Sequence, residues 1–126
     1  MLSRFLTRLS IPVLFFALAA APAQAHHGWA GQSTQTFELS GTVHTAVSLT
    51  GPHATMRIQD KNGQIWDLTL AAPPRTQDAG LKDGVIPVGA MVTVYGKRNS
   101  DPKRFEVKTE RVTHAGKTYN VYPERS

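Results

Sequence analysis

Two adjacent histidines, His26 and His27, follow the tripeptide Ala23-Gln24-Ala25 near the start of the chain. Small residues at these positions are typical of a signal-peptidase cleavage site. Cleavage after Ala25 would make His26 the first residue of the mature chain, where its amino group and its ring offer two nitrogens to one metal ion. An N-terminal amine titrates near neutrality, so it can release its proton to a metal at modest cost. Copper heads the divalent affinity order for such nitrogen ligands.

His53 is the remote histidine that we expect to complete this site. It follows Gly51-Pro52, and the proline fixes the backbone just before the ring. One His53 nitrogen and the two nitrogens of His26 would form a T-shaped ligand set of the histidine-brace type, with His27 as an alternate ligand. The alternative is that His53 is a turn residue whose ring hydrogen-bonds a nearby carbonyl group. The predicted metal ligands are thus His26, His27 and His53, with copper as the first candidate cofactor.

The other histidines and the methionines have simpler interpretations. His44 alternates with apolar neighbours, so we expect it on the outer surface of its strand. His114 closes a strand beside a turn, where a solvated ring is expected. Met56 and Met91 have strand spacing, and we expect both in the core rather than on copper.

Two tryptophans bear on the position of the histidines. Trp66 lies in an apolar strand pattern and is expected to fill the core. Trp29 lies in a polar, glycine-containing segment, residues 28–35, which is expected to be a flexible arm unless something tethers it. We expect Trp29 to pin this arm, and with it His26 and His27, against the body of the protein.

Hydrolytic and phosphate-transfer chemistry find little support in the sequence. The chain has no cysteine, no Gly-x-Ser-x-Gly nucleophile motif and no glycine-rich phosphate loop. Its carboxylates are scattered over predicted turns and outer faces, and the basic residues at 97–98 and 103–104 are expected to form a solvated rim. We therefore expect metal binding or delivery rather than catalysis, because redox turnover at a brace-type copper would need an open substrate face.

Residues 1–25 have the pattern of a secretory signal peptide. Arg4 and Arg8 form a basic region, an apolar run covers residues 11–20, and Ala23-Gln24-Ala25 ends in small residues. The apolar run is too short to cross a bilayer. Cleavage after Ala23 is the second possibility. The leader predicts a periplasmic protein that does not span the membrane.

The mature part, residues 26–126, is short enough for one domain and contains no cysteine. An exported domain of this size without disulfides needs a closed β core or a partner. The net charge of +5 falls to +3 once Arg4 and Arg8 are removed. This mild basicity suits an envelope protein near anionic lipids, and export argues against a nucleic acid as the partner.

Alternating apolar and polar residues predict an almost entirely β domain. In the first strand the residues expected to face inward are Phe37, Leu39, Gly41, Val43 and Thr45, with Gly41 marking a bulge or a sharp bend. Five principal strands with a short helix between the third and fourth predict a small OB-like barrel of five or six strands, and a plain meander is the alternative. Strands are expected over residues 36–47, 54–60, 64–70, 90–96, 104–114 and 118–122, with a hairpin turn at Asn62-Gly63. A helix is expected to start at Pro73-Pro74 and to continue for about two turns over residues 75–82. The predicted domains are the signal peptide 1–25, an N-terminal arm 26–35 and the barrel 36–126.

Several short motifs occur in an order that resembles a known family. They are Ala25-His26-His27, Gly41-Thr42-Val43, Gly51-Pro52-His53, the residues Asp60, Gly63 and Trp66, and Val92-Thr93-Val94-Tyr95-Gly96. In this order they resemble the uncharacterised bacterial exported family catalogued as domain of unknown function 6152. Members of that family begin the mature part with His-His and carry Asn-Pro-His before the second strand. Here Gly51 replaces that Asn and His53 is kept. The resemblance implies an exported barrel and no established activity.

Two functions from different classes follow from the sequence. The first is a periplasmic barrel that binds copper or another transition-metal ion through the processed His26 and the remote His53. The second is a metal-independent interaction module that binds an envelope protein, a glycan or a lipid.

Overall fold

The computed structural model describes residues 29–125, from Trp29 to Arg125. The predicted signal peptide and the predicted ligands His26 and His27 lie outside this range. Within it, no helix is long and apolar enough to cross a membrane.

The domain is almost entirely β, as predicted. Its elements are the strands β1 (Phe37–Ser48), β2 (Thr55–Gln59), β3 (Ile65–Thr69), β4 (Met91–Arg98), β5 (Glu106–His114) and β6 (Lys117–Asn120), the helix α1 (Pro73–Asp78) between β3 and β4, and a final 3-10 turn η2 (Pro123–Arg125).

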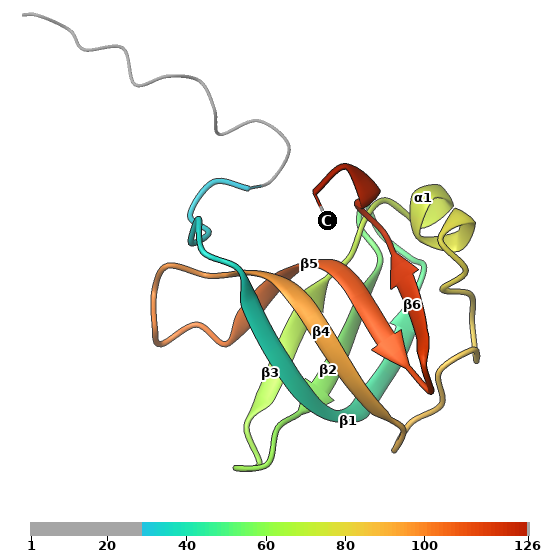
Figure 1. The fold of residues 1–126 in the computed structure, drawn as a ribbon, viewed down its shortest axis with the longest axis horizontal. Helices are drawn as coiled ribbons and strands as arrows, with labels where there is room; N and C mark the ends of the chain where they lie inside the picture. The colour runs from blue at the N-terminus through green and yellow to red at the C-terminus, as the bar shows by residue number, and fades with distance from the viewer. Residues whose placement is uncertain (1–28, 126) are drawn as a thin grey trace, which may run out of the picture.

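Five of the strands close into a barrel (Figure 1). The sheet order is β3-β2-β1-β4-β5-β6, and β3 also pairs with β5. The closing pair is parallel, with Leu68 opposite Val107, whereas all other strand pairs are antiparallel. A plain meander contains no parallel pair, so this closure confirms the OB-like barrel, to which β6 adds an extra strand beside β5.

The inward faces of the strands form one core. Met56 is 1% exposed and Trp66 is 4% exposed, so both predictions of core positions are confirmed. Met91 is 62% exposed, and the prediction that it belongs to the core is wrong. Met91 is the first residue of β4, and the alternation along the strand turns Val92 and Val94 inward and Met91 outward.

Two glycines allow the strands to bend tightly. A Cβ atom at Gly41 would lie 2.5 Å from the Gln59 carbonyl oxygen, and one at Gly96 would lie 2.1 Å from the Lys108 carbonyl oxygen. Gly41 thus marks the sharp bend expected of it. Thr45 does not face inward as predicted, because β1 slips its register against β2 between Val43 and Thr45. The irregularity exposes Thr45 and returns Val47 to the core.

The β2–β3 hairpin is organised by one carboxylate. Asp60 Oδ1 accepts hydrogen bonds from the backbone N–H groups of Asn62 and Gln64 at 2.9 and 3.0 Å. Its Oδ2 accepts one from Trp66 Nε1 at 3.0 Å. The Trp66 hydrogen bond, followed by the backbone donors, lowers the pKa of the Asp60 carboxyl group. Gly63 has a φ of 82°, which completes the predicted turn.

The helix α1 begins at the prolines predicted to start it, and it ends earlier than predicted. It occupies Pro73–Asp78, whereas the sequence pattern continues it to Lys82. The two prolines form its first turn, where their missing N–H groups cost nothing. Gly80 has a φ of 98° and its Cα packs beside the Tyr119 ring, so the helix ends there rather than at Asp83-Gly84.

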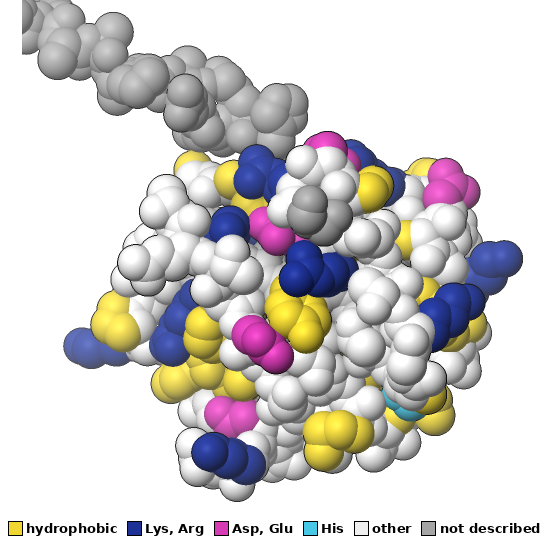
Figure 2. All heavy atoms as spheres, viewed as in Figure 1, with side chains coloured by type: hydrophobic (Ala, Val, Ile, Leu, Met, Phe, Trp, Pro, Cys, Tyr) yellow, Lys and Arg dark blue, Asp and Glu magenta, His cyan; other side chains and the backbone are white. Residues whose placement is uncertain are grey.

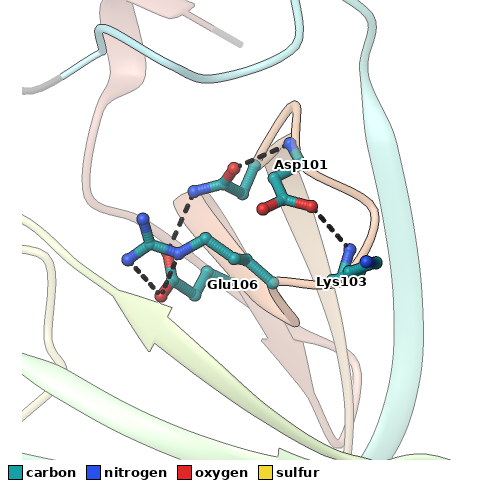
Figure 3. Close-up of polar contacts among 5 residues, drawn as sticks. Asp101, Lys103 and Glu106 are labelled. Atoms are coloured by element: carbon teal, nitrogen blue, oxygen red, sulfur yellow. Dashed lines mark hydrogen bonds and ion pairs between the residues drawn. The ribbon is translucent and has the colours of Figure 1, made fainter.

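The β4–β5 loop is held by its own polar side chains (Figure 3). Asn99 donates to Glu106 at 3.0 Å and accepts from the Asp101 backbone at 2.9 Å, and Asp101 accepts from the Lys103 backbone at 2.9 Å. Arg104 pairs with Glu106 at 3.1 Å. Residues 97–98 belong to β4 rather than to this loop, and β5 begins two residues later than predicted.

Replacing Gly96 by alanine is expected to destabilise the barrel strongly. The new Cβ would overlap the β5 backbone, which cannot move without opening the β4–β5 pair, and overpacking of this kind costs about 1–3 kcal/mol or more. Gly84→Ala is the matched control, because a Cβ at Gly84 would meet nothing within 4 Å, and only its φ of 75° disfavours a side chain. Its expected cost is about 1 kcal/mol, from backbone strain alone. Urea unfolding of both variants measures the difference, and equal losses would contradict the close approach.

Candidate functional site

The segment before β1 lies along the barrel rather than away from it. Gln32 forms an isolated β-bridge with Asn99. The Ser33 N–H donates to the Arg98 carbonyl at 2.7 Å, and the Ser100 N–H donates to the Gly31 carbonyl at 2.8 Å. The two hydrogen bonds of this bridge therefore join the described part of the arm to the end of β4 and the start of the β4–β5 loop.

Trp29 attaches the arm to the C-terminal end of the chain. Its ring meets the Tyr122 ring edge-on, with the centroids 5.3 Å apart. The Arg125 guanidinium lies 3.9 Å from the centroid of the Trp29 ring, and the Lys108 ammonium lies 5.6 Å from it. These contacts place Trp29 against the barrel, in the position expected of a tether.

Trp29 and His53 line the same pocket. Its volume is about 570 Å³, and it lies between the arm, the loop before β2, the start of α1 and the C-terminal turn. The lining residues are Trp29, His53, Ala72, Arg75, Tyr122, Glu124 and Arg125. The anchor of the arm and the predicted remote ligand are therefore together, although 24 positions separate them in the sequence.

The surroundings of His53 favour a neutral ring. Burial, and secondarily the charge of Lys108, lower its pKa below the usual 6.5. Within residues 29–125 the ring makes no hydrogen bond, so the carbonyl contact of the alternative interpretation is absent from the described structure. A neutral imidazole with a free nitrogen is the form that binds a metal ion.

Two buried charged residues on β5, Lys108 and Glu110, were not predicted from the sequence. Lys108 is 5% exposed and Glu110 is 2% exposed, although charged side chains are rarely buried. Trp29 and Tyr122 lie over Lys108, with their ring centroids 5.6 and 5.7 Å from its ammonium group. The Glu110 carboxylate lies 3.9 Å from the Lys97 ammonium. No local signal distinguishes such positions, since the cover comes from both ends of the chain.

The remaining predicted positions are dispersed. His44 is exposed, as predicted, and its Nδ1 lies 3.0 Å from Thr45 Oγ1. His114 is partly buried, and its Nδ1 lies 3.1 Å from the Met91 carbonyl oxygen. In the part of the chain that the structure describes, no three His, Asp or Glu side chains come together as metal ligands.

Arg98 has a different environment from the solvated rim predicted for it. Its guanidinium lies 4.7 Å from the centroid of the Trp66 ring and within 6 Å of the Phe37 and Phe105 rings, at 5.7 and 5.6 Å. Its Nη2 donates to the Pro102 carbonyl at 2.8 Å. Arg98 therefore covers this group of aromatic rings, and its guanidinium has a structural role.

The lowered pKa of His53 predicts a loss of stability on acidification. The unfolded chain binds a proton near pH 6.5 and the folded chain binds it only at lower pH, so unfolding is favoured as the pH falls below about 6.5. Between about pH 7 and about pH 5, the midpoint of urea unfolding should fall less in His53→Gln than in the unmodified chain. His44→Gln is the control and should behave like the unmodified chain. An unchanged pH dependence in His53→Gln would contradict the prediction.

Comparisons with known proteins identify no family for this chain. No family model matches the chain, and no curated protein sequence matches it, so the resemblance to an uncharacterised exported family stays a prediction. Among solved structures, the chain is similar to apo TiaS, a tRNAIle2 agmatidine synthetase, with a TM-score of 0.48 and 18% identity over 64% of this chain and 18% of that chain. It is also similar to a chain of the S. pombe Stn1-ten1 complex, with a TM-score of 0.49 and 18% identity over 65% of this chain and 59% of that chain. The chain spans less than two thirds of the length of either neighbour.

Proposed function

We propose that this chain is an exported, periplasmic barrel that binds a transition-metal ion, copper in the first place, after cleavage behind Ala25. In this proposal the His26 amine and ring chelate the metal, His53 supplies the remote nitrogen and His27 is an alternate ligand. The role is metal binding or delivery rather than catalysis. The residues present are suited to copper chemically, since two imidazoles and an amine are all nitrogen donors.

The observation that carries the proposal is the shared pocket of Trp29 and His53. Trp29 is held by the edge-on contact with Tyr122 and by the stacked Arg125 guanidinium. His26 precedes Trp29 by three residues, and an extended chain advances about 3.3–3.6 Å per residue, so His26 reaches at most about 10 Å from this anchor. The pocket lined by His53 begins at the anchor itself.

The charges around the pocket both favour and oppose the binding of a metal ion. The low pKa of His53 leaves its ring free of a competing proton at neutral pH. The Lys108 ammonium that contributes to this shift also repels a dication. A complete set of nitrogen ligands would therefore be needed for tight binding, and His53 alone would bind copper weakly.

The second candidate function is a metal-independent interaction module for an envelope protein, a glycan or a lipid. It is supported by two apolar side chains outside the core, Val88 at 64% exposed and Met91 at 62% exposed. Basic and acidic side chains are interspersed over the face shown in Figure 2. A protein of this class would keep its binding activity when the mature N-terminus is blocked.

A copper titration of the processed protein tests the first proposal. The chain is expressed with its own leader, the mature N-terminus is verified by intact mass, and Cu(II) is titrated by calorimetry against a competing chelator. We expect an apparent Kd below about 1 µM. One extra residue before His26 removes only the free amine and should weaken binding at least about tenfold, as should His53→Ala. His44→Ala is the matched control and should bind like the unmodified chain.

Binding of micromolar strength or weaker in the processed protein would overturn the metal proposal. Affinity that is unchanged both by the added residue and by His53→Ala would do the same, because it would place the copper elsewhere. In either case the interaction module becomes the favoured function.

Trp29 is expected to act as a positioning residue for the metal. Trp29→Ala removes the contacts with Tyr122 and Arg125 and frees the arm, so Cu(II) affinity should fall about tenfold or more. Trp29→Phe keeps an aromatic ring and should recover most of this loss. The electron paramagnetic resonance spectrum of the Cu(II) form should lose the His53 nitrogen in the Ala variant. A purely structural role would lower thermal stability without altering the spectrum of the bound copper.

A further inference from the structure

Lys108 is a buried cation without an anionic partner in the described structure. Its side chain is 5% exposed, and its ammonium group lies 5.6 Å from the centroid of the Trp29 ring and 5.7 Å from that of the Tyr122 ring. Among residues 29–125 it takes part in no ion pair. A buried charge of this kind is costly unless an anion or hydrogen-bond acceptors compensate it, and contact with two ring faces compensates it only in part.

A second cation lies at the same place. The Arg125 guanidinium lies over the Trp29 ring, which Lys108 also contacts, at 3.9 Å from the ring centroid. Within residues 29–125 Arg125 too forms no ion pair with a carboxylate. The charges of Lys108 and Arg125 are close enough that Arg125 contributes to lowering the pKa of Lys108, after burial.

The carboxylate nearest to these cations is already engaged. Glu124 pairs with Arg75, and Arg75 also lies over the Tyr122 ring, 4.8 Å from its centroid. One acidic and two basic side chains therefore line the pocket. Lys108 is not a lining residue, but its ammonium group contacts the rings of Trp29 and Tyr122, which do line it. Because Glu124 is paired with Arg75, the charges of Lys108 and Arg125 leave a surplus of positive charge at this pocket among residues 29–125.

We propose that this pocket is a binding site for a small oxyanion, either a phosphate or a carboxylate of a small organic acid. Arg125 presents a planar set of donors that matches two oxygens of such a group, and Lys108 adds a compact positive charge beside the Trp29 and Tyr122 rings. The volume of about 570 Å³ is large enough for a small organic acid.

The oxyanion site goes beyond the proposed metal site and does not depend on it. Both would share the wall formed by Trp29 and the position of His53. An oxyanion beside Lys108 would offset the repulsion between this lysine and a bound dication. The pocket would then take up a metal ion together with an anion more readily than either alone.

The test uses the processed, metal-free protein after treatment with a chelator. Inorganic phosphate and citrate are titrated separately by nuclear magnetic resonance, at constant ionic strength maintained with chloride. We expect saturable shifts of the Trp29 indole N–H signal with at least one of the two anions. Arg125→Gln and Lys108→Met should each weaken binding at least about tenfold. Lys103→Gln removes an equal charge from the exposed β4–β5 loop and should bind like the unmodified chain.

Thermal unfolding supplies a second readout that separates a ligand site from a structural lysine. Methionine has a similar length and no charge, so Lys108→Met should raise the Tm while it weakens anion binding. A lysine retained for its ring contacts would show a lower Tm in the same variant.

Saturable binding of phosphate alone, of citrate alone or of both would support the site, and the preferred anion would identify its chemical class. Absence of saturable shifts with either anion would overturn it, as would an equal loss in Lys103→Gln. A lower Tm in Lys108→Met with unchanged binding would also overturn it. Because no metal is present, a failure of copper binding leaves this result unaffected, and the reverse also holds.

Discussion

The parallel pairing of β3 with β5 is the constraint on which the rest of the structure depends. Without it the antiparallel pairs would form an open sheet, and β5 would have a solvated face. With it, β5 is enclosed by β3, β4 and β6. The β4–β5 pair can approach closely enough only because Gly96 carries no side chain at the point nearest Lys108. The barrel closure and the burial of charged residues on β5 thus have the same origin.

The two ends of the described chain, at Trp29 and Arg125, contact each other and pack against the barrel. The arm is attached by Gln32 and Ser33 to the end of β4, and Trp29 continues to the turn that holds Tyr122 and Arg125. These contacts form one wall of the pocket that also contains His53. Stability and site geometry are coupled here, because the side chains that hold the arm also shape the pocket.

The same packing sets the electrostatics of the pocket. Lys108 is withdrawn from water under two aromatic rings, and its charge helps to keep His53 neutral. A neutral imidazole suits a metal ion, while the surplus positive charge suits an anion. The two proposed ligands differ in sign, and their presence together would balance the charge better than either one.

The sequence by itself determined the order of the elements, the inward side chains of β2 and β3, the Asp60 hairpin and the bend at Gly41. These features depend on alternation and on residues close in the chain, such as the glycine needed at Gly63. Local pattern was misleading at Thr45, where β1 slips its register, at Met91, where the direction of β4 turns the side chain outward, and at α1, which Gly80 ends early.

Only the tertiary structure decided which residues surround His53. The arm, the loop before β2, α1 and the C-terminal turn are far apart in the sequence and meet only after the barrel closes. A sequence pattern reports the neighbours of a residue within a few positions, so it could suggest that Trp29 anchors an arm without indicating where. Lys108 shows the same limit most clearly, since a lysine within an alternating strand looks solvated until segments from both ends of the chain cover it.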